Sequence, residues 1–382
     1  MLGFLTAIIA PSAATGATTV TPSLELRAGY NSNLRLAIID EVDTAYSRVD
    51  AGVNVTRDRP TSQLAADFRW RNLQHDRAEF ADTDDFFIDA GATRAFETWS
   101  VGVNASAARE NTLTTAFEDT GFVDIGVQRE RIRVTPTLSW ARSETVTYSA
   151  VVGDEDVSYE DSPNFVDYDY RQYTLSRNQS LSETLDWFVA LSLDEFATDD
   201  GFNESATTTL RLGVSHRPSE TLSLDASVGR SRVETDQVVS FFGFLFPQSS
   251  EDDGWQANVN LRKSWEHTVL TVEVSQSILP TGQGDLSERR VGKISLRNAL
   301  SERTALRLSA EYFDFDDVST LSSEEDNREY GRLSLALDVR LNQAWLLTAT
   351  LSHREQEFDI RDDVARATTG YIGFRYTPRA AR

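Results

Sequence analysis

The residues that could carry out acid–base or metal chemistry are few and scattered. The chain has four histidines and no cysteine, and no histidine lies at HExxH spacing or in a serine–histidine–aspartate set. Paired acids such as Asp84 and Asp85 could act as a general acid and base, or hold Ca²⁺, but none has the spacing of an EF-hand loop. We therefore predict no catalytic site, no metal site, no cofactor and no enzymatic activity.

Arginines at alternate positions are the more informative polar residues. Only Lys263 and Lys293 among the 37 basic residues are lysine. These arginines share one face of their segments with acidic residues. Such a face is either a mixed-charge ladder that guides a polyanion or a hydrated sugar, or a set of ion pairs that stiffens a barrel. We predict that the following residues line a pore: Arg131, Arg133, Arg211, Asp225, Arg262, Glu273, Lys293, Arg297, Arg307, Glu311, Arg332, Asp338 and Arg340.

The segments that position these charges alternate with a period of two residues. In the clearest of them, Leu333, Leu335 and Leu337 fall on one face, while Arg332 and Asp338 fall on the other. This pattern is typical of β-strands, and no segment shows a comparable helical stripe. After the first residues no apolar run of about 18 residues occurs, which excludes a helical membrane span.

Two kinds of turn separate these segments. Short turns such as 143–145, 182–184 and 219–221 recur about every 40 residues, whereas the opposite ends are longer and acidic, as in 251–254. We count eighteen segments, among them 123–141, 221–232 and 254–263. An even number of strands places both termini on the short-turn side.

The charged second face favours a membrane barrel over a soluble sandwich or a β-propeller. The strands are about 10 to 14 residues long, enough to cross a bilayer when tilted. Trp99, Trp140, Trp187, Trp265 and Trp345 lie beside the short turns, as an interfacial girdle requires. A propeller repeats at a similar period but has four short strands per repeat. The sequence therefore predicts an all-β, closed antiparallel transmembrane β-barrel of about 18 strands over residues 21–377.

The expected environment follows from this fold. We predict an outer membrane of a Gram-negative bacterium, with short periplasmic turns, longer acidic extracellular loops, and both termini periplasmic. Outer-membrane lipid and lipopolysaccharide would surround the barrel. The net charge of −23 excludes nucleic acid as a partner. Residues 1–17 resemble a secretory signal peptide whose start is truncated, and 378–382 form a short periplasmic tail.

One apolar segment, 238–247, interrupts the acidic side. Its residues Phe241, Phe242, Phe244, Leu245 and Phe246 fall in a long loop that we expect over 232–253. Exposed apolar patches usually mark an interaction. We predict a gating or partner-binding loop, and the alternative is an extension of the flanking strands.

The opening segment, Thr21-Pro22-Ser23-Leu24 running to Tyr30 and Asn33-Leu34, resembles the first strand of the putative β-barrel porin-2 family. The layout of the whole chain is also similar to that family. The resemblance implies secretion of exopolysaccharide, with a periplasmic polysaccharide-export protein as a partner. The alternatives are a diffusion porin for small solutes and a closed structural or adhesin-like barrel. The terminal aromatics Tyr371, Phe374 and Tyr376 precede a tail, which departs from the usual aromatic end of such barrels.

Overall fold

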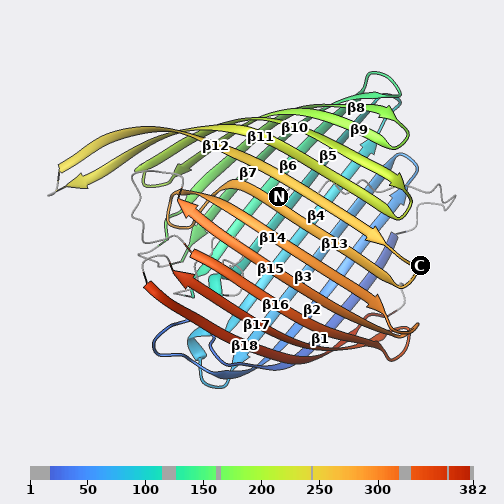
Figure 1. Cartoon of the computed structure of the whole chain (residues 1–382), viewed down its shortest axis with the longest axis vertical. Helices are drawn as coiled ribbons and strands as arrows, with labels where there is room; N and C mark the ends of the chain where they lie inside the picture. Colours follow the sequence, from blue (N-terminus) through green and yellow to red (C-terminus); the bar gives the residue numbers. More distant parts are fainter. Residues whose placement is uncertain are drawn as a thin grey trace.

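The computed structural model describes residues 18–113, 126–160, 165–241, 244–317, 328–358 and 361–378. They form one closed antiparallel barrel of eighteen strands (Figure 1). Each strand pairs with its neighbours in the sequence, and β1 also pairs with β18, so that no strand edge stays open around the circumference. Closure satisfies the backbone groups that lipid cannot bond. The fold class and the strand number predicted from the sequence are confirmed.

The first nine strands are β1 Thr18–Asn31, β2 Thr44–Arg59, β3 Ser62–His75, β4 Thr83–Ala95, β5 Trp99–Asn111, β6 Gln128–Ala141, β7 Val146–Tyr159, β8 Tyr168–Ser182 and β9 Leu185–Thr198. The other nine are β10 Asn203–Ser219, β11 Leu222–Phe241, β12 Phe244–Ser264, β13 Thr268–Pro280, β14 Leu286–Ala299, β15 Thr304–Asp317, β16 Arg328–Arg340, β17 Trp345–Phe358 and β18 Arg361–Tyr376. A short 3₁₀ helix, η1 (Glu79–Ala81), lies between β3 and β4. Among the described residues, no helix is long and apolar enough to cross a membrane.

The outer face of the barrel is apolar and exposed. Leu333, Leu335 and Leu337 on β16 are 55%, 46% and 38% exposed, and the register pairs Leu335 with Leu308 and Leu351 on the neighbouring strands. Aliphatic side chains therefore continue around the circumference instead of filling a core. Such a surface is stable only in apolar surroundings.

The short turns gather at one end of the barrel together with both described termini (Figure 1). An aromatic belt lies at this end. Trp99 stacks on Trp140 with ring centroids 5.8 Å apart, and Trp140 stacks on Tyr148 at 5.7 Å. Trp345 packs against Tyr376 at 4.9 Å. Amphipathic rings of this kind concentrate where a bilayer meets water.

The apolar segment 238–247 differs in structure from the loop that we expected over 232–253. β11 and β12 stay paired as far as Phe241 opposite Phe244, which makes both strands longer than predicted. β12 pairs with β13 only from Ala257 onward, and β11 pairs with β10 only as far as Gln237. Beyond Gln237 the two strands therefore form a two-stranded ribbon. Its yellow end projects past the other strands in Figure 1. Phe242 lies outside the described residues, and the predicted gating or partner role of the segment stays a prediction.

Other expectations also fall outside the described residues. The predicted signal peptide, 1–17, lies there, as does most of the predicted tail, 378–382. The strand that we expected over 123–141 begins at Gln128, and residues 114–125 are not described.

Candidate functional site

Side chains that meet across the barrel identify its interior. Leu36, in the loop between β1 and β2, belongs to one buried cluster with Phe313 of β15 and Ala367 of β18. These strands are not neighbours of one another, so their side chains can meet only inside the barrel. Because side chains alternate along a strand, every second residue counted from Phe313 points inward.

The residues predicted to line the pore share this inward face. On β15, Arg307 and Glu311 have the same parity as Phe313. The register then places Arg332 opposite Glu311, and Lys293 opposite Glu311 on the other side. Residues that lie opposite each other in the register point to the same side of the sheet. Following the register from strand to strand in this way places the remaining predicted residues inward: Arg131, Arg133, Arg211, Asp225, Arg262, Glu273, Arg297, Asp338 and Arg340.

The wall formed by β1 to β7 is a network of ion pairs. Asp50 accepts hydrogen bonds from Arg48 at 2.6 Å and from Arg71 at 3.2 Å. On β6, Arg129 donates to Glu110 at 2.6 Å, and Arg133 lies 3.3 Å from Glu155 on β7. Charges that are paired in this way stiffen the wall, and each such pair adds little net charge to the lumen.

The wall formed by β12 to β16 carries excess positive charge. Arg307 pairs with Asp338 at 2.8 Å, and Arg297 lies directly opposite Arg307 in the register. Like charges in directly opposed positions repel each other. Within the described part of the chain, four inward-facing basic side chains of this wall form no ion pair: Arg262, Lys293, Arg297 and Arg340.

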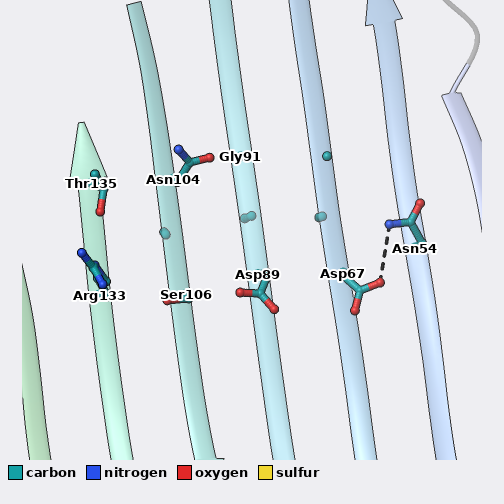
Figure 2. Close-up of a pocket in the computed structure, with 12 residues that line it drawn as sticks. Asn54, Asp67, Asp89, Gly91, Asn104, Ser106, Arg133 and Thr135 are labelled. Carbon is teal, nitrogen blue, oxygen red and sulfur yellow. Dashed lines mark hydrogen bonds between the residues drawn. The ribbon is translucent and has the colours of Figure 1, made fainter. Parts of the chain in front are cut away.

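A hollow in the opposite wall is lined by polar side chains of β2 to β6 (Figure 2). It has a volume of about 380 Å³. Asp67 and Asp89 lie opposite each other in the register, and Asn54 donates to Asp67 at 3.5 Å. Neither carboxylate is ion-paired to a described residue. This part of the wall is therefore polar and negative.

The β1–β2 loop (residues 32–43) folds inward at the end opposite the short turns. Leu36 is 2% exposed and packs on Phe313, Phe315 and Tyr330. Asn33 holds the loop in shape by donating to the Ala37 carbonyl at 2.8 Å and accepting from the Ala37 N–H at 3.0 Å. Leu36 has a φ of 51°, a left-handed conformation that leucine adopts only when packing compensates its cost.

The β13–β14 loop (residues 281–285) folds inward from another part of the circumference. Its Gly282 carbonyl accepts a hydrogen bond from the Val166 N–H at 2.9 Å, and Asn203 donates to the Gly284 carbonyl at 2.7 Å. Ile278 and Leu286, at the ends of the flanking strands, join a buried apolar cluster. Its other members are the inward-facing Val157, Tyr168, Phe196 and Val233. Two loops with buried anchors therefore narrow this mouth of the lumen.

The β3–β4 loop is attached to β2 by a carboxylate. Asp76 Oδ1 accepts hydrogen bonds from the Thr44 hydroxyl at 2.8 Å and the Ala45 N–H at 2.9 Å. The Thr44 hydrogen bond lowers the pKa of Asp76 below its ordinary value. This attachment is therefore complete at neutral pH and weakens as the pH falls through the lowered pKa.

The histidines and paired acids do not form a common site. Asp84 and Asp85 point to opposite faces of β4: Asp84 accepts from Asn72 at 2.8 Å, while the buried Asp85 accepts from the Asn111 N–H at 3.0 Å. His216 lies 3.1 Å from the Thr184 carbonyl. No cluster of three metal-binding side chains occurs among the described residues.

Gly29 on β1 lies between two inward tyrosines, Tyr46 and Tyr371, in the register. A Cβ at position 29 would lie 2.6 Å from Tyr46 Cζ and 2.7 Å from the Gly370 carbonyl oxygen. We therefore expect Gly29→Ala to lower the free energy of unfolding by about 1–3 kcal/mol, measured by urea titration of the refolded barrel. Gly292→Ala is the matched control, because a Cβ there meets nothing within 4 Å. Equal stability of both variants would contradict the predicted clash.

The sequence matches no protein-family model and no curated protein. The fold is similar to that of several solved structures. OpdQ from Pseudomonas aeruginosa is 10% identical with a TM-score of 0.50, and the alignment covers 94% of this chain and 97% of that one. OccK2 (OpdF) from the same organism is 9% identical with the same coverage and a TM-score of 0.50. At such identities, the likeness shows a shared barrel fold.

Proposed function

We propose that this protein is a passive diffusion pore for small polar solutes in the outer membrane of a Gram-negative bacterium. The observation that carries the proposal is a lumen of fixed charges that is narrowed at one mouth by two inward loops. The unpaired basic residues of the β12–β16 wall favour anions among those solutes. The exposed apolar exterior and the aromatic belt support the membrane location.

The narrowed mouth favours small solutes over a polymer. An exopolysaccharide needs a continuous path that is wide enough for a hydrated chain. Here Leu36 and Leu286 anchor the two loops in buried clusters inside the barrel. The secretion pore and its periplasmic export partner, expected from the family resemblance, therefore have less support than the diffusion pore.

The orientation of the barrel is part of the proposal. We place the short turns and both termini in the periplasm, and the longer loops and the β11–β12 ribbon outside the cell. Barrels of this type have short periplasmic turns and long external loops. Surface proteolysis of intact cells that cuts the ribbon but spares the short turns would support this orientation.

Ion selectivity tests the proposal. We expect single channels in planar bilayers under a KCl gradient to give a reversal potential that favours chloride at about 0.1 M salt. The preference should weaken towards 1 M, where the Debye length falls to about 3 Å. The double variant Arg297→Gln/Arg340→Gln should lose much of the preference, because both charges are unpaired. A barrel that conducts no ions would refute the pore and favour the closed, adhesin-like alternative.

A further inference from the structure

An inward arginine on β17, Arg354, has two hydrogen-bond donors without a partner. Its Nε and Nη2 atoms are shielded from solvent and find no acceptor within the described part of the chain. These two nitrogens form one edge of the guanidinium, the fork that binds a carboxylate with two parallel hydrogen bonds. A buried charged donor left unpaired is unfavourable, and an incoming anion removes this cost.

Two other arginines of the same lumen show what this edge does when a carboxylate is present. Arg48 donates from Nε and Nη2 to the two oxygens of Asp50, at 2.6 Å and 2.8 Å. Arg375 donates from the same two nitrogens to a single oxygen of Glu25, Oε2, at 2.7 Å and 2.5 Å. Arg354 presents the same geometry, but no protein carboxylate occupies it.

Within the described part of the chain, no acidic side chain forms an ion pair with Arg354. The groups that act on its charge are Tyr330, which is hydrogen-bonded to it, together with Arg332 and Tyr46. Arg332, opposite in the register, is 3.8 Å from its own partner, Glu311. On the other side, Arg354 faces Ala367, whose side chain is packed beneath the Leu36 cluster.

We infer that the Arg354 fork is a binding subsite for the carboxylate of a small organic anion on its way through the lumen. The inference rests on the proposed pore function and adds a substrate class to it. Tyr330 is hydrogen-bonded to the same guanidinium, and Tyr46 lies near enough to act on its charge. Because the fork is shielded, the anion displaces a covering side chain when it binds. Its position beside the Leu36 cluster places the subsite at the narrowed mouth.

Saturable transport tests the subsite. We expect the protein-dependent rate of acetate entry into liposomes, after subtraction of entry into protein-free liposomes, to saturate with acetate concentration, while protein-dependent glycerol entry stays linear. Arg354→Lys keeps the charge but removes the fork. It should raise the half-saturating acetate concentration about tenfold, since a bidentate charged hydrogen-bonded pair is replaced by a point charge. Its reversal potential in KCl should not change.

The matched control is Arg366→Lys, on the outer face of the adjacent strand, where Arg366 pairs with Glu355 at 3.0 Å. It should leave acetate entry unchanged. Folding of each variant is checked by circular dichroism before reconstitution. An unchanged half-saturation in Arg354→Lys, or saturation with inorganic phosphate but not acetate, would overturn the carboxylate subsite. Absence of any solute entry through the wild-type protein would instead refute the pore itself.

Discussion

Shortening the β1–β2 loop is expected to raise the single-channel conductance roughly twofold, because the loop occupies the mouth of the lumen. The variant replaces residues 34–41 by a Gly-Ser turn between β1 and β2. Leu36 then no longer covers Phe313 and Phe315, whose side chains become wetted. The conductance is measured in planar bilayers at 1 M KCl, where fixed charges are screened.

Deletion of 238–247 is the control for this experiment. The β11–β12 ribbon projects away from the barrel (Figure 1), so its removal should leave the conductance unchanged. A gate formed by Phe241 to Phe246 would give the reverse result, with the larger change in the ribbon deletion. If neither deletion alters the conductance, the narrowest part of the path lies deeper in the lumen.

The second prediction compares how much an added arginine lowers the stability of the barrel at two consecutive residues of β5. Val103 is 40% exposed on the outer face, whereas Asn104 points into the polar hollow of Figure 2. We expect Val103→Arg to lower the free energy of unfolding by about 2–4 kcal/mol, the cost of a basic side chain near the bilayer midplane.

Asn104→Arg places the same side chain one residue along, in the lumen beside Asp89. It should change stability by less than about 1 kcal/mol, because water and a carboxylate solvate the added charge. Both values come from reversible urea unfolding in liposomes. Equal losses of unfolding free energy at the two positions would show that the two faces of β5 do not meet lipid and water respectively. That result would contradict a barrel with an apolar outer face and a polar lumen.

Much of the architecture could be predicted because the physical rule behind it is local. The period-two alternation around Leu335 needs no knowledge of distant contacts: a strand with one lipid face and one water face must alternate. The number of strands followed from the spacing of the short turns. The parity of Arg332 and Asp338 placed them inward for the same reason.

The ends of the longest strands could not be predicted in the same way. β11 and β12 continue through polar and acidic residues such as Glu234 and Asp252, which match no alternation of apolar residues. They remain paired because each strand bonds to the other, with ion pairs such as Arg232 to Glu251 at 2.6 Å between them, and β11 also bonds to β10 as far as Gln237. That stabilisation depends on the partner strand and not on the segment itself.

The inward loops were also missed, although the sequence contained one signal for them. Phe313 and Phe315 share the parity of Arg307 and Glu311, so they had to point into the lumen. Large apolar side chains facing water need a cover. The identity of that cover, Leu36, depends on a left-handed backbone conformation and on contacts between residues far apart in the chain, which spacing alone does not reveal.

The segregation of paired and unpaired charge has a consequence for molecules that carry no net charge. The acidic hollow lies on β3 and β4, and Arg297 of the unpaired basic wall lies on β14, seven or eight strands away by the shorter path in a ring of eighteen. The two therefore face each other across the bore. A zwitterion such as an amino acid would experience a torque there, with its ammonium end turned towards Asp67 and Asp89 and its other end towards Arg297. Passage would then depend on the direction of a molecular dipole as well as on size.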